Sequence, residues 1–205
     1  ILYLNPLIHP FLNTGRFCVL TRTIAVANQK GGVGKTTTAV NLSASLASLE
    51  KNVLLIDLDP QGNATSGLGI DKNSLARSVY DILVERQPIF TALLPTELPH
   101  LQLLPANSDL VGAESHLLGE KDGSGKWRLT ESLRDYLRTL TQGQQAGRPD
   151  YLIIDCPPSL GLLTLNALIA SHSLFIPVQC EYYALEGLTE LFKTFTVIQQ
   201  RYNPG

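Results

Sequence analysis

Residues 29–37 read Gln-Lys-Gly-Gly-Val-Gly-Lys-Thr-Thr and lie between a short apolar run at 24–27 and a helix-patterned segment at 38–49. A strand, a glycine loop and then a helix form the context of a phosphate-binding loop. The glycines let several backbone N–H groups point at one anion, and the helix N-terminus adds the positive end of its dipole. In such a loop Lys35 lies along the phosphates and the Thr36 hydroxyl binds Mg²⁺. A glycine-rich turn with chance neighbours is the alternative, and the Gly-Lys-Thr triplet in this context argues against it.

The loop departs from the usual pattern G-x-x-x-x-G-K-[ST], because Gln29 replaces the first glycine and Lys30 adds a second lysine. With these residues the chain resembles the ParA/Soj-type partitioning ATPases of the deviant Walker A (MinD/ParA) superfamily of P-loop NTPases. The resemblance implies that Lys30 reaches across a dimer interface to the partner's nucleotide, as an arginine finger does. A solvated Lys30 without a function is the alternative. The resemblance also implies an ATP site made by Lys30, Gly31, Gly32, Val33, Gly34, Lys35, Thr36 and Thr37.

Composition sets broad bounds. A chain of 205 residues suffices for one α/β domain with a full core. A net charge of −2 and a pI of about 6.1 do not by themselves indicate a nucleic-acid or acidic-membrane partner. Three cysteines, Cys18, Cys156 and Cys180, show no C-x-x-C spacing, which favours reduced thiols in a cytoplasmic protein over disulfides or a zinc site.

Two regions are expected. Residues 1–21 are apolar but interrupted by Pro6 and Pro10, which favours a poorly ordered N-terminal extension over a membrane span or a signal peptide. Residues 22–205 are expected to form the P-loop ATPase domain. The resembled family continues for several more strands, so we expect this domain to be incomplete at its C-terminus.

Apolar runs alternate with helical patterns along the chain. Strands are predicted at 23–28, 53–57, 101–104, 151–155 and 174–178, and helices at 37–49, 78–85, 108–118, 129–141, 160–170 and 185–201, with a loop at 60–72. Strands that are apolar on both faces belong to parallel sheets covered by helices. The order predicts an α/β fold with a doubly wound, mostly parallel sheet of the P-loop NTPase kind.

Aspartates end two of the apolar strands, and the carboxyl ends of such strands line the ligand crevice of open α/β sheets. Asp155 fits a Walker B aspartate that holds Mg²⁺, although an aspartate capping the next helix is the alternative. Asp57 and Asp59 alternate onto one side of the backbone, which suggests one outer Mg²⁺ contact and one group that orients the attacking water. A polar turn also suits this sequence.

The run Asp57–Thr65, Asp-Leu-Asp-Pro-Gln-Gly-Asn-Ala-Thr, resembles the A′ motif of the ParA/Soj branch. This implies that Asp59 orients the water and that Asp57 joins Thr36 and Asp155 at the metal.

Further matches to the family occur at 156–161 and 177–188. The resemblance implies a cytoplasmic, nucleoid-associated ATPase that is slow without its partner, forms an ATP-dependent homodimer and binds DNA without sequence preference. A ParB-type protein would stimulate its hydrolysis during chromosome or plasmid partitioning. We expect the family's DNA contacts in the missing C-terminal part. Arg128, Arg134 and Arg138 occur singly on a predicted helix and are interpreted as a solvated face.

Two alternatives remain open. One is a related positioning ATPase that acts on a membrane-bound or protein cargo instead of DNA, although no C-terminal amphipathic helix is visible in this sequence. The other is an inactive nucleotide-binding module. The presence of Lys35, Thr36, Asp59 and Asp155 argues against inactivity.

Overall fold

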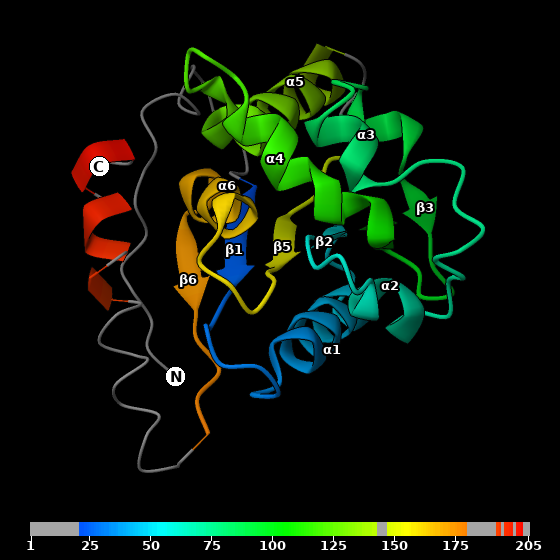
Figure 1. The fold of residues 1–205 in the computed structure, drawn as a ribbon. Helices are drawn as coiled ribbons and strands as arrows, with labels where there is room; N and C mark the ends of the chain where they lie inside the picture. Colours follow the sequence, from blue (N-terminus) through cyan, green and yellow to red (C-terminus); the bar gives the residue numbers. More distant parts are fainter. Residues whose placement is uncertain (1–20, 143–146, 180–191, 194, 199, 203–205) are drawn as a thin grey trace.

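A computed structural model describes residues 21–142, 147–179, 192–193, 195–198 and 200–202 (Figure 1). Within them six strands form one sheet in the order β3-β4-β2-β5-β1-β6. The strands are β1 Arg22–Val26, β2 Val53–Asp57, β3 Leu94–Pro95, β4 Leu101–Leu104, β5 Tyr151–Asp155 and β6 Ser173–Phe175. Only β3 is antiparallel to its neighbour in this sheet. The predicted α/β fold with a mostly parallel sheet is confirmed.

Helices cover both faces of the sheet. Figure 1 shows α1 and α2 on one side and α3, α4, α5 and α6 on the other. Their bounds are α1 Lys35–Ser48, α2 Asn63–Gly67, α3 Val79–Leu83, α4 Ala113–Leu118, α5 Arg128–Gln142 and α6 Leu162–Ala170, with 3₁₀ turns at Ile89–Thr91, Ser108–Gly112 and Ser124–Trp127. The doubly wound arrangement is therefore present.

The central strand β2 explains why the sheet needs two helical layers. All five of its residues are buried. Leu54 and Ile56 belong to the hydrophobic core that includes α3 to α6, whereas Val53 and Leu55 belong to the core beneath α1. Successive strand residues point to opposite faces, so an uninterrupted apolar run fills both cores.

Apart from shifts at the ends of elements, such as β6, which ends at Phe175 instead of residue 178, the structure differs from the sequence prediction mainly in three places. The predicted loop at 60–72 contains α2, and the single helix predicted at 108–118 is a 3₁₀ turn followed by α4. The proline-broken stretch before Pro99 contributes β3, which is only two residues long. All three are short elements whose formation depends on tertiary contacts rather than on a long periodic pattern.

Some predictions cannot be compared with this structure. The N-terminal extension at 1–21 falls almost entirely outside the described residues, as do residues 185–191 of the last predicted helix. The division into an extension and an ATPase domain therefore stays a prediction. Among the described helices, none is both long and apolar enough to cross a membrane.

Candidate functional site

The loop between β1 and α1 has the backbone of an anion cradle. Gly32 and Gly34 have φ angles of 73° and 89°, in the left-handed region that favours glycine. A Cβ added at Gly31, Gly32 or Gly34 would meet no described atom within 4 Å. Backbone conformation and open space above the loop, rather than tight packing, therefore account for glycine at these positions.

The amino end of α1 lies on this loop. The helix begins at Lys35 after Gly34, and no described side chain caps its first turn. The first N–H groups of a helix have no partner inside the helix, and the helix dipole is positive at this end. A 14-residue helix that starts directly after a glycine loop thus presents several donors to an anion.

Residues that follow β6 brace the loop. The Asn28 side chain donates to the Pro177 carbonyl at 2.7 Å and accepts from the Lys30 N–H at 3.1 Å. The Gln179 side chain donates to the Gly32 carbonyl at 3.2 Å. Asn28 has no role in the sequence prediction, although a polar residue directly after an apolar run is a signal for one. Gln179 entered only as part of a family motif.

The two loop lysines have different surroundings. Lys35 is buried, and its Nζ donates to the Lys30 carbonyl at 3.0 Å. Burial lowers the pKa of Lys35, while the nearby Asp155 and Asp59 carboxylates act in the opposite direction. The Lys30 side chain is exposed. Lys35 therefore belongs to the interior of the site and Lys30 to its surface.

Asp155 is the most unusual carboxylate of the site. It is fully buried at the end of β5, and no described residue donates a hydrogen bond to either of its oxygens. Burial raises the pKa of Asp155 to about 7; the Asp57 and Asp59 charges add to the rise, and Thr36 and Lys35 oppose it. The Thr36 hydroxyl is near enough to affect this pKa without making a hydrogen bond of normal geometry. A buried ionised carboxylate without a partner is costly, and either a proton, as the raised pKa indicates, or a bound cation relieves that cost.

Asp57 lies beside Asp155 in the sheet but is fully engaged. Its Oδ1 accepts from the Asp59 N–H at 3.1 Å, and its Oδ2 accepts from the N–H and hydroxyl of Thr65 at 2.9 and 2.8 Å. Burial raises the pKa of Asp57 to about 6, although these hydrogen bonds act against the rise. Asp59 follows two residues later, and its Oδ1 accepts from the Gln61 N–H at 2.9 Å.

These residues fit a magnesium ion that arrives with a nucleotide. Among the described residues no cluster of three His, Cys, Asp or Glu side chains could hold a metal by itself. Mg²⁺ does not require such a cluster, because it keeps several waters and takes one or two protein ligands together with phosphate oxygens. The unpartnered Asp155 carboxylate and the neighbouring Thr36 hydroxyl suit that role. Asp57 already accepts three hydrogen bonds.

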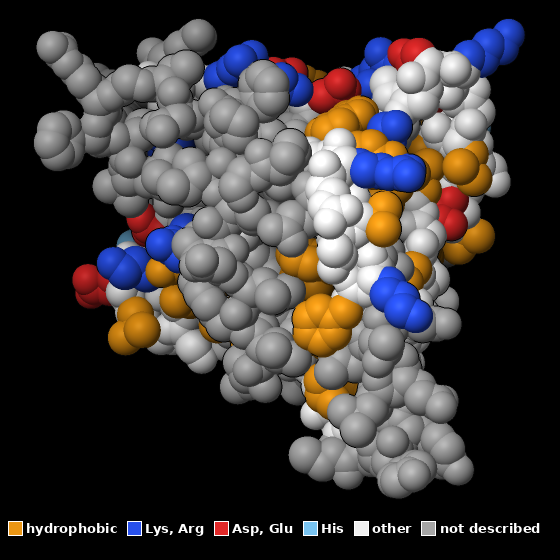
Figure 2. Space-filling model, turned by 90° about the vertical axis from the view of Figure 1, so that its left-hand side faces the viewer, with side chains coloured by type: hydrophobic (Ala, Val, Ile, Leu, Met, Phe, Trp, Pro, Cys, Tyr) orange, Lys and Arg blue, Asp and Glu red, His pale blue; other side chains and the backbone are white. Residues whose placement is uncertain are grey.

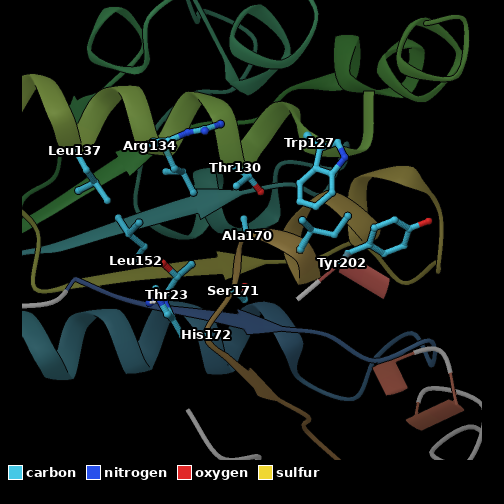
Figure 3. Close-up of a pocket in the computed structure, with 12 residues that line it drawn as sticks. Thr23, Trp127, Thr130, Arg134, Leu137, Leu152, Ala170, Ser171, His172 and Tyr202 are labelled. Atoms are coloured by element: carbon cyan, nitrogen blue, oxygen red, sulfur yellow. Dashed lines mark hydrogen bonds between the residues drawn. The ribbon is translucent and has the colours of Figure 1, made fainter. Parts of the chain in front are cut away.

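A second cavity, of about 320 Å³, lies elsewhere in the molecule (Figure 3). It is lined by α5, by the end of α6 and by Thr23 and Leu152 near the amino ends of their strands. In Figure 3 the Trp127 and Tyr202 rings lie together at one end of it, edge to face with centroids 5.8 Å apart. Because the phosphate loop follows the carboxyl end of β1, this cavity is not part of the phosphate site.

The expectation for the arginines of α5 is wrong in part. Arg128 is only 6% exposed and forms hydrogen bonds with Glu120 and Glu131, because acidic side chains around the start of α5 surround it. Arg134 lines the second cavity. Arg138, with a side chain 66% exposed, does lie on the solvated face. On the face shown in Figure 2 the Lys and Arg side chains are scattered and form no continuous basic stripe among the described residues.

A parallel sheet with helices on both faces, a glycine loop between β1 and α1, and buried aspartates at the carboxyl ends of β2 and β5 define a P-loop NTPase fold. An AAA domain family model matches residues 21–205. The chromosome partitioning protein ParA of Myxococcus xanthus is 54% identical over 183 residues, which are 89% of this chain and 61% of that protein. The sporulation initiation inhibitor protein Soj of Bacillus subtilis is 51% identical over 89% of this chain and 68% of its own length. The chain belongs to the ParA/Soj family.

A solved structure supports the same fold. A cobyrinic acid a,c-diamide synthase from Mycobacterium smegmatis, with bound ATP analog and magnesium, is 43% identical with a TM-score of 0.80. The match covers 90% of this chain and 71% of that one. The chain spans between 61% and 68% of the length of the two partitioning relatives.

Proposed function

We propose that this protein binds Mg²⁺-ATP in the loop of residues 30–37 and hydrolyses it to ADP and phosphate. The observation that carries the proposal is the Asp155 carboxylate, buried without a hydrogen-bond partner beside Thr36 and Lys35. When Asp155 is ionised its buried charge needs a cation, and the adjoining glycine loop offers donors to an anion. A magnesium phosphate ester satisfies both requirements. The ATP analog and magnesium in the M. smegmatis structure support the same ligand.

Each residue has a proposed task. The backbone of Gly31, Gly32, Val33 and Gly34 and the first turn of α1, including Thr37, hold the phosphates, and Lys35 neutralises their charge by exchanging its contact with the Lys30 carbonyl for phosphate oxygens. Thr36 and Asp155 hold Mg²⁺, with Asp57 as an outer contact. When bound, Mg²⁺ neutralises the charge that develops on the phosphate oxygens.

Asp59 is proposed to orient the attacking water. It lies near enough to Lys35 and Asp155 for their charges to interact, which supports a position beside the proposed phosphate site. Its Oδ1 accepts from the Gln61 N–H, which fixes the carboxylate relative to the loop. A carboxylate held in this way can accept a hydrogen bond from water and align it with the phosphorus.

The proposed cellular task is chromosome or plasmid partitioning. The support is the identity to ParA of M. xanthus and to Soj of B. subtilis. The proposed task includes ATP-dependent pairing of two subunits, in which Lys30 completes the partner's site. It also includes binding to DNA without sequence preference and stimulation of hydrolysis by a ParB-type protein. The synthase shares less sequence with this chain than either partitioning relative does, so we favour partitioning over a synthetic reaction.

Nucleotide and DNA binding test the proposal in the full-length protein. Calorimetry should detect Mg²⁺-ATP, and duplex DNA should be retained only with ATP and lose retention steeply with salt. Absence of nucleotide binding would contradict the ATPase. Binding of nucleotide without ATP-dependent DNA retention would contradict partitioning and favour a cargo other than DNA.

A further inference from the structure

Thr65 is buried at the centre of a hydrogen-bond network that none of the proposed tasks uses. Its hydroxyl donates to Asp57 Oδ2 at 2.8 Å and accepts from the Ala106 N–H at 3.0 Å, and its own N–H donates to the same carboxylate oxygen at 2.9 Å. Thr65 is fully buried, as is Asp57. One hydroxyl thus links the end of β2 to the segment that follows β4.

The acid loop, residues 59–65, is fixed by this network at both ends. At its start the Asp59 N–H donates to Asp57 Oδ1, and at its end Thr65 holds Asp57 Oδ2. In the middle, Gly62 lies against the Ala106 carbonyl so closely that an added Cβ would be only 2.8 Å from it. The Asp57 carboxylate therefore sets the conformation of the loop that carries Asp59.

We propose that Thr65 is a positioning residue for the hydrolytic step. Through Asp57 and Ala106 it holds the acid loop so that Asp59 faces the phosphate site, without itself contacting nucleotide or water. The inference rests on the proposed ATPase function. It assigns to Asp57 a task beyond the magnesium contact expected from the sequence, because three of its acceptor positions are used to organise the loop.

The geometry separates positioning from nucleotide binding. The phosphate loop is braced from another side by the hydrogen bonds of Asn28, Pro177 and Gln179, and none of these three hydrogen bonds involves Thr65. A loosened acid loop should therefore leave nucleotide affinity intact and misplace the water. A displacement of about 1 Å in a catalytic group can cost about 100-fold in rate.

The test compares Thr65→Val, Thr65→Ser and Thr21→Val in the full-length protein. Thr65→Val keeps the side-chain shape and removes the hydroxyl, and Thr65→Ser restores it. Thr21 is a matched control, because it is also buried and its hydroxyl also donates to a carbonyl, Pro149 at 2.7 Å, and accepts a hydrogen bond, from Arg148 at 3.1 Å. Thr21 precedes β1 and so lies at the other end of the sheet from the phosphate loop.

For Thr65→Val we expect kcat to fall about 10- to 100-fold while Kd for Mg²⁺-ATP changes less than about twofold. Thr65→Ser should recover most of the rate, and Thr21→Val should keep it. Unchanged kcat in a folded Thr65→Val protein would overturn the inference. A loss of affinity in proportion to the loss of rate, or failure of Thr65→Ser to recover it, would also overturn it.

Hydrogen exchange provides a readout that needs no turnover. In nucleotide-free protein, Thr65→Val should speed exchange of the Ala106 and Asp59 amides about tenfold or more. Ala106 loses its acceptor, the Thr65 hydroxyl, and the Asp57 carboxylate that accepts from the Asp59 N–H loses the hydroxyl hydrogen bond that helps to fix it. If wild-type protein bound no nucleotide, the ATPase proposal would fail, and this experiment would still decide whether Thr65 orders the acid loop. Unchanged exchange at Asp59 would refute that ordering.

If Thr65→Val does not fold, Thr65→Ser with both measurements decides alone: normal kcat and protected amides support the inference, and a large loss of either contradicts it.

Discussion

At the scale of single residues, Lys35 tests the phosphate site most directly. Lys35→Ala removes the one cation that the described site buries among its carboxylates. Loss of a hydrogen bond between charged groups costs about 1.5–3 kcal/mol, so nucleotide affinity should fall about 10- to 100-fold in calorimetry. Lys51→Ala, at an exposed position before β2, should bind normally. Equal affinities for the two variants would contradict the proposed site.

Asp155 gives a residue-scale prediction about pH. Its pKa is raised from 3.8 to about 7 in the folded protein, so between these values the native state holds a proton that the unfolded state has lost. Stability of the nucleotide-free protein should therefore fall as pH rises through this window. Asp155→Asn should be more stable than wild type by about 1–3 kcal/mol at pH about 8 and nearly equal to it at pH about 4. Urea unfolding at both pH values measures this difference, and Asp135→Asn, exposed on α5, should show none. A gain that is the same at both pH values would contradict this origin.

At the scale of elements, the sequence predicted what depends on local pattern. β2 and β5 have the predicted bounds. Each is a run of four apolar or aromatic residues that ends in Asp, with turn signals on both sides, so the sequence leaves little choice for where the strand begins and ends. The end of β6 and the short helix α2 were missed. α2 forms because Gly62 adopts a left-handed conformation and the Thr65 hydroxyl donates to Asp57. Neither feature appears as a periodic pattern of apolar residues in the sequence.

The candidate site shows the same division. The glycine loop, Lys35 and Asp155 were recognised because they lie in one short motif or at a strand end. The contacts of Asn28 with Pro177 and of Thr65 with Ala106 join segments 149 and 41 residues apart. A single sequence does not reveal such pairs, because their formation depends on the strand order of the folded sheet.

The contact between the acid loop and the segment after β4 predicts the behaviour of two glycines. Both glycines have a left-handed φ, 60° at Gly62 and 78° at Gly69, which an alanine would have to adopt. In Gly62→Ala the new Cβ would also lie 2.8 Å from the Ala106 carbonyl oxygen, whereas in Gly69→Ala it would lie in open space. A left-handed conformation costs an L-residue about 1–2 kcal/mol, and overpacking adds about 1–3 kcal/mol. Urea unfolding should therefore show a larger loss for Gly62→Ala. Equal losses would show that the contact with Ala106 contributes nothing.

At the scale of the whole molecule, the distribution of charge in the site argues for a second subunit. Asp59 and Asp155 lie near Lys35, the one lysine buried among the described residues, Asp57 lies beside Asp155, and ATP brings further negative charge. Lys30 differs from Lys35 in its exposure. Its side chain is exposed at the mouth of the loop, while its carbonyl faces Lys35. We propose that this exposed lysine serves a nucleotide bound by a facing copy of the chain.

Lys30→Ala should therefore separate binding from pairing in the full-length protein. Nucleotide affinity of the monomer should stay within about threefold of wild type, because the phosphates remain bound by the loop amides and Lys35. Size-exclusion with Mg²⁺-ATP should give a monomer for Lys30→Ala and a dimer for Asp59→Ala, which binds the nucleotide but lacks the group that orients water.

Mixing the two variants adds a sharper test. In a mixed dimer, the nucleotide on the Lys30→Ala subunit has an intact Asp59 and receives Lys30 from its partner, so the mixture should recover turnover that neither variant shows alone. Recovery of turnover requires Lys30 to act in trans, whereas full activity of Lys30→Ala by itself would show that the second lysine is only a solvated side chain.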